Sequence, residues 1–546
     1  MAADHVRRLR VASWHLLSSR VTMGGGAVAV GSFDAERCKL YTGHTTGAVI
    51  LIAVIAASGG LLFGFDNGIT GGVISHSGFE ARFFGHHVAG NDPFCKFNDQ
   101  MLQLFTSCLF LSGAAAAMVG SYTCRRFGRK ATMIAGGACF LGGTVLVTLA
   151  IHMAMLVLGR LVLGVGVGFA TQATPLYLSE MAPFNMRGAL NIMFQLAVTV
   201  GILGAQLINF GTQHIKPWGW RLSLAMGAVP SLILFFGSML LPDTPNSLVQ
   251  RGRYEDGRKV LQRIRGTDNV DVEFDDIVEA VRISASVKNP WRTITRRRYW
   301  PQLVISILVP IFQQLTGINA IMFYAPQLFQ AAGHSAESAL LSTVITGAVN
   351  VASTFVAIIL VDRVGRRALF IQGGIQMLIC EVVVGFLIKQ NFETPGNDAL
   401  ASAIIALICL YVAGFAWSWG PLGWLVPSEI QPLETRAAGT GLNTFCNFLF
   451  TFFIGQLFLT LLCALKWGTF LFFGGFVLLM TLFVILCIPE TKGVPIEELS
   501  EVIIHKHWLW SRVVAGAPLE TAPHEEPGSG LDDVAPGRDQ GLAKVV

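Results

Sequence analysis

The chain has 546 residues, of which 53% are hydrophobic and 13% are charged. Soluble globular proteins carry about 25% charged residues, so the composition excludes a soluble protein and predicts an integral membrane protein. The net charge of +5 does not indicate nucleic-acid binding, because the basic residues lie in short loops between apolar runs. The ten cysteines include no Cys-x-x-Cys pair and no Cys/His cluster at zinc-ligand spacing, so we expect no metal and no other cofactor.

Residues 1–46 precede the first apolar run, and we expect them in the cytoplasm. Positions 1–22 carry four arginines and one acid, a composition that resembles a transit peptide. A second methionine at position 23 allows another interpretation, in which the first 22 residues are an upstream extension. The sequence alone leaves both interpretations open.

Twelve apolar runs follow, each long enough to cross a bilayer as a helix of about 20 residues. They lie near 48–76, 101–121, 132–152, 154–176, 189–212, 221–241, 301–329, 338–361, 368–388, 401–426, 437–462 and 468–488. A polar stretch separates the first six from the last six. The sequence therefore predicts an all-α integral membrane protein with an N-terminal bundle over 47–242, a linker with short helices over 243–300, a C-terminal bundle over 301–490 and a tail over 491–546.

Lysine and arginine are concentrated in alternate connections. The 122–131 loop holds four of them and the 362–367 loop holds three, whereas the 77–100 loop holds two. Cytoplasmic loops of membrane proteins carry such an excess. We therefore expect the central linker and both termini in the cytoplasm and the 77–100 loop outside the cell.

Three short motifs occur once in each half, in the same order. RRFGRK at 125–130 recurs as DRVGRR at 362–367, SEMAPFNMRG at 179–188 recurs as SEIQPLETRAAG at 428–439, and PDTP at 242–245 recurs as PETKG at 489–493. The offsets between matching positions are 237, 249 and 247 residues. Duplicated six-helix halves around a site at the membrane midplane are typical of secondary transporters.

Asp66 lies inside the first apolar run among six glycines. A carboxylate at membrane depth costs about 2.5 kcal/mol or more, so it is usually retained for a proton, an ion or a partner. The glycines would let a neighbouring helix approach closely or let this helix unwind. The alternative is an acid near the membrane surface that only caps a helix.

Arg160 lies inside the fourth run and needs an anion in the membrane. Asp66 is the anion that we expect in the first half. An arginine partner favours the charged form of a carboxyl group, whereas burial favours the neutral form. A group under both influences can change its protonation when the packing changes, which is what proton coupling requires.

Uncharged amides and a tryptophan lie inside runs of both halves. They are Gln195, Gln313, Gln314, Asn319, Asn350, Asn447 and Trp424. Gln314 stands 248 positions after Asp66, close to the offset between the halves. Amides offer donors and acceptors to a ligand with many hydroxyls, and a flat ring can stack on a sugar. The alternative is that buried amides only hold helices together.

The basic loop motifs predict a latch at the cytoplasmic face. A glycine permits a tight turn between two helices, and the flanking arginines can bond helix carbonyls or acids of neighbouring helices. The residues proposed for this latch are Arg126, Arg129, Glu180, Arg187, Asp362, Arg363, Arg366, Glu429, Arg436 and Glu490. The alternative is that these loops only mark orientation.

Longer segments carry a specific resemblance. They are GRLVLGVGVGFATQATPLYLSEMAPFNMRGALN, FQQLTGINAIMFYAP, GFAWSWGPLGWLVPSEIQPLETR and PETKGVPIEEL. From about Tyr41 to Arg512 the chain resembles the sugar-porter branch of the major facilitator superfamily, and more closely the plant and green-algal monosaccharide/proton symporters. The resemblance implies the major facilitator fold, with twelve transmembrane helices in two pseudo-symmetric six-helix bundles.

The resemblance also implies roles for single residues. Asp66 would bind the proton with Arg160 as its partner. The sugar-binding side chains would be Gln195, Gln313, Gln314, Asn319, Asn350, Trp424 and Asn447. Facilitative sugar porters of animals have no acid at the Asp66 position, so this residue favours symport over uniport.

In this family an extracellular lid, here within 77–100, is tied to the eleventh helix by a disulfide. The resemblance implies that Cys95 and Cys463 form this bond, since both would face an oxidising compartment. Arg125 departs from the family, because many members have an aspartate at that position. The latch of the first half must then take its acid from elsewhere.

We therefore expect proton-coupled import of a monosaccharide, glucose or a similar hexose, by alternating access rather than enzymatic chemistry. The alternatives are a facilitative uniporter, which would not need Asp66, and a non-transporting sugar sensor, which typically has a longer signalling tail. The expected partners are the sugar, a proton and the lipid bilayer, with no nucleic acid. We expect a monomer in the plasma membrane, or in an intracellular membrane if positions 1–22 are a targeting segment.

Overall fold

The computed structural model describes residues 46–515, apart from 85–94, 96–97, 184–186, 288, 332–334, 394–397, 433 and 493–506. This part of the chain is helical and contains no strand. The predicted N-terminal segment 1–46, except its last residue, lies outside the described residues. So do much of the predicted lid and most of the tail 491–546.

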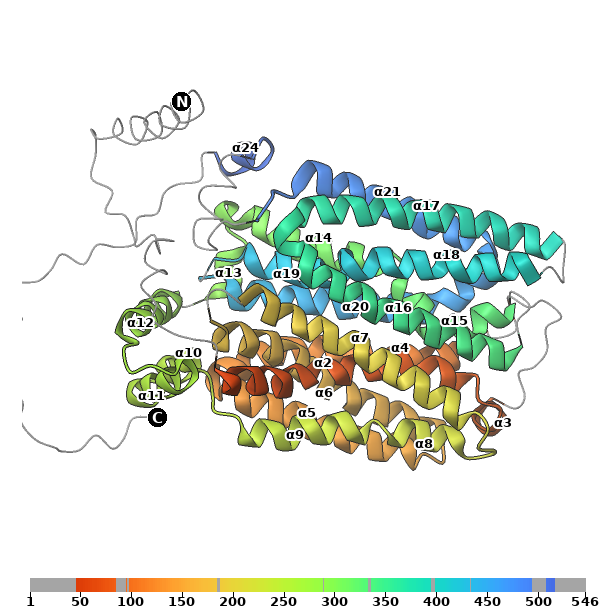
Figure 1. Ribbon diagram of the computed structural model, residues 1–546, viewed down its shortest axis with the longest axis horizontal. Coiled ribbons are helices and arrows are strands. Elements are labelled where there is room, and N and C mark those ends of the chain that lie inside the picture. The colour runs from red at the N-terminus through yellow and green to blue at the C-terminus, as the bar shows by residue number, and fades with distance from the viewer. Residues whose placement is uncertain are drawn as a thin grey trace, which may run out of the picture.

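The first half runs from α2 to α9. Its helices are α2 (Gly47–Ile74), α3 (Ser77–Phe83), α4 (Gln100–Arg126), α5 (Arg129–Thr148), α6 (Met153–Met181), α7 (Arg187–Thr212), α8 (Gly219–Ala225) and α9 (Ala228–Leu240). Helices α8 and α9 together form the sixth apolar span. The short α3 lies at one end of the molecule, which we call the lid end (Figure 1).

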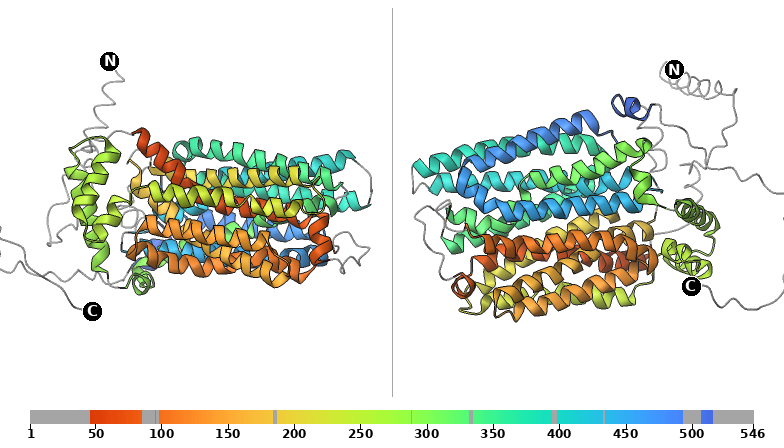
Figure 2. Two further views of the ribbon diagram at one scale, coloured as in Figure 1. Left: turned by 90° about the horizontal axis from the view of Figure 1, so that it is seen from below. Right: turned by 180° about the vertical axis from the view of Figure 1, so that it is seen from behind.

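The linker helices gather at the opposite end, the linker end (Figures 1 and 2). They are α10 (Pro245–Gln250), α11 (Tyr254–Arg265), α12 (Asp271–Ser286) and α13 (Pro290–Ile294), followed by the 3-10 helix η3 (Arg297–Tyr299). The second half comprises α14 (Trp300–Leu315), α15 (Ile318–Ala331), α16 (Ala336–Val364), α17 (Arg366–Glu393), α18 (Asp398–Trp417), α19 (Trp419–Glu429), α20 (Arg436–Leu465) and α21 (Gly468–Cys487). The short α24 (Trp510–Val514) follows near the end of the described chain.

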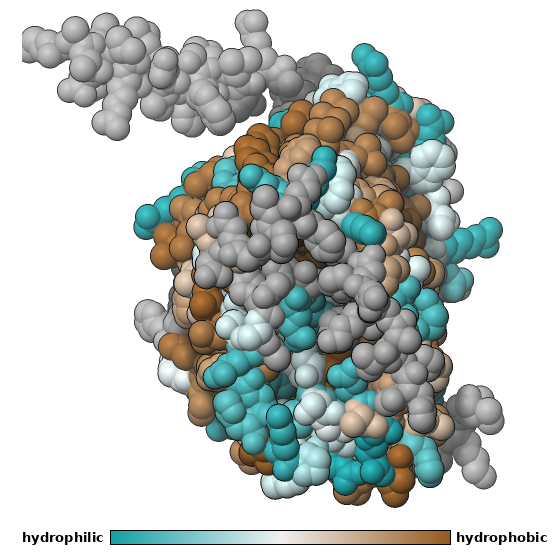
Figure 3. Space-filling model, turned by 90° about the vertical axis from the view of Figure 1, so that its right-hand side faces the viewer, coloured by the Kyte–Doolittle hydropathy of each residue, from teal (hydrophilic) through white to brown (hydrophobic). Residues whose placement is uncertain are grey.

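Within the described residues, twelve helical spans are long and apolar enough to cross a membrane. Six precede the linker and six follow it, which confirms the predicted order of apolar runs. Large apolar side chains such as Leu158, Phe236 and Ile379 are exposed along these spans, as expected for contact with lipid. Viewed from the lid end, hydrophilic residues gather on the end face beside hydrophobic residues that continue onto the sides (Figure 3).

The two halves lie side by side, with α2–α9 below and α14–α21 above in Figure 1. They meet where α4 packs against α20 and where α7 packs against α16. These are the second and eleventh spans and the fifth and eighth spans. If each span is replaced by its equivalent in the other half, six places away, the contact of spans 2 and 11 becomes the contact of spans 8 and 5. The two contacts are thus related by the pseudo-symmetry that the sequence predicts.

Two spans of the second half are interrupted. Helix α14 ends at Leu315 and α15 begins at Ile318, with Gly317 between them at a φ of +79°. Glycine adopts a positive φ without a steric penalty, so this position permits the interruption. Helices α18 and α19 are likewise separated at Ser418. Interrupted helices leave backbone groups for side chains or ligands to bind, and both interruptions lie beside predicted amide or tryptophan positions.

Candidate functional site

Asp66 on α2 and Arg160 on α6 form an ion pair in the first half. Only 3% of the Asp66 side chain and 0% of the Arg160 side chain are exposed. The guanidinium also donates to the carbonyls of Phe105 (2.9 Å) and Thr106 (3.2 Å) and to the hydroxyl of Thr70 (3.1 Å). Oδ2 of Asp66 has no hydrogen-bond partner among the described residues. If Asp66 took up a proton, Arg160 would keep its hydrogen bonds to these two carbonyls and to the hydroxyl.

A row of glycines fixes α2 against its neighbours. A Cβ at Gly60, Gly64 or Gly68 would lie 1.9 to 2.5 Å from a backbone oxygen of α7, closer than packed atoms allow. A Cβ at Gly71 would lie 2.6 Å from a backbone oxygen of α15, in the other half. Because α2 is continuous through this stretch, the glycines around Asp66 allow close helix packing rather than unwinding.

Gln313 on α14 is the centre of an amide network in the second half. Its Nε2 donates to the carbonyls of Trp419 (2.8 Å) and Gly420 (3.0 Å) on α19. Its Oε1 accepts a hydrogen bond from Nδ2 of Asn447 on α20 (2.7 Å). Oδ1 of Asn447 is buried and has no partner among the described residues. The network joins three helices and leaves one acceptor for a ligand.

The other proposed sugar-binding residues lie around this network. Asn319 donates to Oε1 of Gln314 across the interruption between α14 and α15. Trp424 on α19 packs edge-on against an aromatic ring of α7, with the ring centroids 6.3 Å apart. Gln195 on α7 approaches Gly420, where a Cβ would lie 3.5 Å from Nε2 of the glutamine. Side chains of both halves therefore meet at α19.

Asn350 is buried on α16, the helix that packs against α7. Among the described residues, neither Asn350 nor Gln195 forms a side-chain hydrogen bond with the Gln313 network. The structure thus brings the predicted amides to the contact between the halves but joins only some of them directly.

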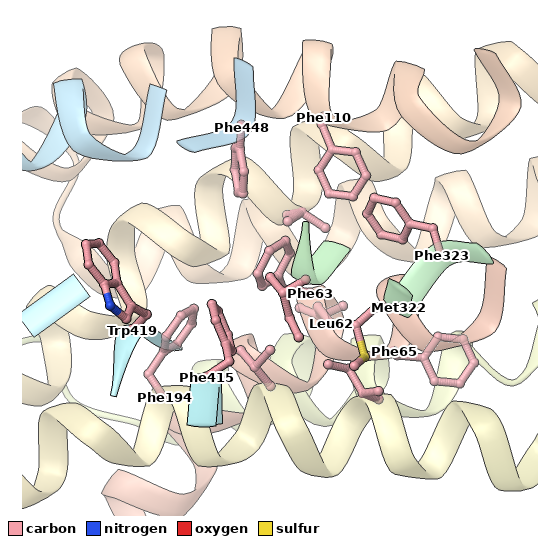
Figure 4. Close-up of a cluster of buried hydrophobic side chains, with 14 of the residues drawn as sticks. Leu62, Phe63, Phe65, Phe110, Phe194, Met322, Phe323, Phe415, Trp419 and Phe448 are labelled. Atoms are coloured by element: carbon pink, nitrogen blue, oxygen red, sulfur yellow. The ribbon is translucent and has the colours of Figure 1, made fainter. Parts of the chain in front are cut away.

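Aromatic rings of both halves lie next to these sites (Figure 4). The ring of Phe63 on α2 lies 5.5 Å from that of Phe448 on α20 and 6.4 Å from that of Phe110 on α4. Phe63 is about one helical turn before Asp66, and Phe448 directly follows Asn447. The rings therefore pack together the helices that carry the ion pair and the amide network.

At the linker end, Arg129 of α5 forms an ion pair with Glu180 of α6 at 2.7 Å. Thr244 donates to the other carboxylate oxygen of Glu180 (2.5 Å). Gly128, just before Arg129, has a φ of +95°, and a Cβ there would lie 2.1 Å from Oδ2 of Asp243. These contacts join the residues proposed for the latch of the first half.

The second half repeats the arrangement. Arg366 of α17 forms an ion pair with Glu429 of α19 at 3.1 Å, and Thr491 donates to the other oxygen of Glu429 (3.0 Å). Glu490 accepts hydrogen bonds from the backbone N–H groups of Arg366 and Arg367 (2.9 and 3.1 Å). Both ion pairs join elements of one half, so neither connects the halves in this conformation.

The other described residues proposed for the latch lie at the ends of further helices. Arg126 is exposed and donates to a tyrosine hydroxyl of its own helix (2.6 Å). Arg363 is exposed at the end of α16, and Arg436 begins α20. The side chains of Arg187 and Asp362 lie outside the described residues.

Three residues that the sequence analysis did not single out complete the latch. Thr244 and Thr491 hold the glutamates, and Asp243 forms an ion pair with Arg251. All three belong to the PDTP and PETKG repeats, so the duplication was a usable signal. Asp243 also supplies an acid beside the turn of the first half, where Arg125 replaces the family aspartate.

Cys95 and Cys463 form a disulfide at the lid end. Beside it, Thr460 on α20 accepts hydrogen bonds from Gln100 (3.1 Å) and Gln103 (3.2 Å) on α4. The halves are therefore joined here by a covalent bond and by hydrogen bonds.

His76 lies between α2 and α3 at the same end. Its Nδ1 accepts a hydrogen bond from the backbone N–H of Gly78 (3.1 Å) and so caps α3. Burial lowers the pKa of His76 from its ordinary value of 6.5. The neutral imidazole that the cap requires is therefore favoured.

The arrangement matches a known family. Residues 52–503 match the family model described as "Sugar (and other) transporter". The chain belongs to this family. Individual relatives of this transporter match it over nearly their whole length.

The transporter is 51% identical to sugar transport protein 10 of Arabidopsis thaliana over 502 residues, which cover 90% of this chain and 97% of the relative. It is 53% identical to sugar transport protein MST7 of Oryza sativa subsp. japonica over 487 residues, covering 87% and 95%. Its structure is similar to that of the proton:xylose symporter XylE bound to 6-bromo-6-deoxy-D-glucose. The TM-score is 0.71 at 26% identity, with 84% of this chain and 99% of that chain covered. These matches confirm the predicted major facilitator fold.

Proposed function

We propose that this transporter imports a monosaccharide, glucose or a similar hexose, together with a proton. Two relatives are named sugar transport proteins, and XylE is described as a proton:xylose symporter whose structure contains a brominated deoxyglucose. The observation that carries proton coupling for this chain is the buried ion pair of Asp66 and Arg160. An acid at membrane depth that can lose its charge without leaving its partner unbonded suits a proton site.

Protonation of Asp66 would remove the attraction between α2 and α6, while Arg160 keeps its bonds to Thr70 and to two backbone carbonyls. Helix α2 would then be able to shift against α6. Because α2 contacts α15 at Gly71, the shift would reach the half that contains the Gln313 network. Rocking of the halves at their two contacts would open the site inward, and loss of the proton would restore the ion pair.

The amide groups would bind the sugar hydroxyls, and the ring of Trp424 would pack on the apolar face of the sugar. The proposed sugar-binding residues are Gln195, Gln313, Gln314, Asn319, Asn350, Trp424 and Asn447. The free acceptor of Asn447 and the interrupted helices supply polar groups in an otherwise apolar interior.

We place the linker end and both termini in the cytoplasm and the lid end outside the plasma membrane. The arginine-rich loops lie at the linker end, as cytoplasmic loops do. The disulfide lies at the lid end, as expected for an oxidising exterior. The bundles would then keep the boundaries 47–242 and 301–490, and the transporter would act as a monomer in the bilayer.

The test is the external pH of weakly buffered cells that lack their own hexose carriers and express this chain. Adding glucose should raise the external pH for the wild type and for Glu337→Gln, an exposed carboxyl group at the lid end of α16. It should not do so for Asp66→Asn. Uptake of labelled glucose without a pH change in any variant would mean a uniporter. Glucose binding without uptake would mean a sensor.

A further inference from the structure

A second buried carboxyl group lies outside the sites described above. Glu381 on α17 is 4% exposed, and its Oε2 has no hydrogen-bond partner among the described residues. None of the ion pairs found in the described chain includes it. At a rise of 1.5 Å per residue, Glu381 lies about 22 Å along α17 from Arg366, deep in the membrane span. The mechanism proposed above does not use it.

The carboxyl group of Glu381 lies against α21 at Gly474. A Cβ at Gly474 would lie 3.6 Å from Oε2, so the glycine leaves room for the carboxyl group but offers it no polar side chain. The ionisable groups near Glu381 are Cys380 on its own helix and Tyr411 on α18. The one ionisable side chain of α21, Cys487, lies roughly 20 Å along that helix. Helices α16 and α19 carry their charged residues near their ends.

Within the described part of the chain, no cation therefore balances a negative charge on Glu381. An ionised carboxylate in an apolar interior is strongly disfavoured unless it is paired or hydrogen-bonded. The neutral acid is the form that fits this environment. Ionisation would require water or a cation to enter between α17 and α21.

Tyr411 connects Glu381 with the interruption in the seventh span. Its hydroxyl donates to the carbonyl of Thr316 (2.5 Å), and the Thr316 hydroxyl donates to the carbonyl of Gln313 (2.7 Å). Tyr411 lies on α18, which packs against the helix of Glu381, α17. A negative charge on Glu381 would act on the Tyr411 hydroxyl and so on the position of Gln313.

We propose that Glu381 is a second proton-binding site of this protein, and that its bound proton keeps the amide network of the second half able to bind sugar. The proton on Glu381 would thus act on the second half, whereas the proton on Asp66 acts on the first. The sugar-linked part of this proposal rests on the proposed function.

The first test detects the proton directly. Infrared spectroscopy of the purified protein in lipid vesicles should show a C=O stretch of a buried carboxylic acid. Glu381→Gln should remove this band, whereas Glu337→Gln, the exposed control, should leave it. Glu381→Met, which has a similar volume and no proton, should also remove it. A spectrum that Glu381→Gln and Glu381→Met leave unchanged would overturn the proposal.

The second test links this proton to sugar binding. Glucose binding is measured by calorimetry at acidic and alkaline pH in the Asp66→Asn background, where the first proton site is absent. Binding should weaken at least tenfold from acidic to alkaline pH in Asp66→Asn and should stay constant in Asp66→Asn/Glu381→Gln. Constant binding in the single variant, or the same weakening in both, would refute the proposal. A wild type that binds no glucose would overturn the proposed function, and the infrared band would still decide the proton site.

Discussion

Arg160 differs from most buried ion-pair partners because three of its four acceptors cannot change their charge. When one member of a buried ion pair is lost, the other is usually left without a partner, at a cost of about 3–5 kcal/mol. Here the carbonyls of Phe105 and Thr106 and the hydroxyl of Thr70 remain bonded to the guanidinium. Protonation of Asp66 therefore costs less than breaking an isolated pair, which suits the proton-binding role proposed above.

Asn447 offers a test of the amide network at the same scale. Asn447→Ala would remove the donor to Oε1 of Gln313 and leave that acceptor buried without a partner, which costs about 1–3 kcal/mol. We expect glucose to bind about tenfold or more weakly to the purified transporter. Gln376→Ala, which removes an exposed bond to the carbonyl of Leu410, should change binding much less. Equal losses in the two variants would contradict the assignment.

The sequence identified Asp66, Arg160 and the amides because polar side chains inside apolar runs are rare and costly. The pairing of Asp66 with Arg160 was predicted and is present, but their other partners could not be predicted in the same way. Two acceptors of Arg160 are backbone carbonyls, which carry no signal in the sequence. The bond between Gln313 and Asn447 depends on how two distant helices are rotated toward each other.

At the scale of the helix, glycines bring α2 into contact with backbone atoms of both halves, so the movement proposed above would pass from one half to the other. The sequence predicted close packing or unwinding around Asp66, and the continuous α2 shows close packing. Which face of each helix meets the protein could not be predicted. Lipid is as apolar as a protein interior, so the exposed Leu51 and the buried Ala56 on α2 give the same signal.

Gly64 tests this packing. Gly64→Val would place a side chain 1.9 Å from the Val198 carbonyl oxygen and force α2 and α7 apart. Overpacking of this kind costs about 1–3 kcal/mol or more, so we expect a lower unfolding temperature of the purified protein. Gly475→Val is the matched control, because a Cβ at Gly475 meets no atom within 4 Å. A similar unfolding temperature in both variants would refute the role of the glycine row.

The cap of α3 should depend on pH. Because burial lowers the pKa of His76, the unfolded chain binds this proton more readily than the folded chain. The stability that the cap contributes is present above about pH 6.5 and is lost as the pH falls through the folded-state pKa. His76→Asn keeps a capping oxygen that does not titrate, so acidification should lower the unfolding temperature more in the wild type. The control is His152→Asn, at a helix start without a side-chain cap, and its unfolding temperature should depend on pH as that of the wild type does. If the unfolding temperature of His76→Asn fell as much on acidification as that of the wild type, the role of the cap would be refuted.

For the whole molecule, the twelve spans and the duplication could be predicted because the length of the apolar runs, their hydropathy and the motif offsets can be read from the sequence without knowledge of packing. The disulfide between Cys95 and Cys463 was predicted and is present, but the noncovalent contacts between the halves were not predicted, since α4 and α20 carry no motif that pairs them. These contacts include hydrogen bonds at both ends, such as those of Thr460 at the lid end and of Ser121 with the carbonyl of Ala437 toward the linker end. The covalent link is found at the lid end alone among the described residues.

Removal of the disulfide should loosen the halves at the lid end. A disulfide contributes about 2–4 kcal/mol to stability, so Cys463→Ser should lower the unfolding temperature. A reductant should lower that of the wild type to the same value and leave Cys463→Ser unaffected. An effect of the reductant on Cys463→Ser would mean that another group is responsible.

The two latches have a consequence for the energetics of the cycle. Each ion pair, Arg129 with Glu180 and Arg366 with Glu429, lies within one half, so a rotation of one half against the other stretches neither of them. The proposed latches would therefore stabilise each half from within, and they would do so in the same way in both halves because each half has an arginine, a glutamate and a threonine in equivalent places. Loss of either ion pair should then lower the stability of its own half and leave the balance between the outward and inward orientations almost unaltered.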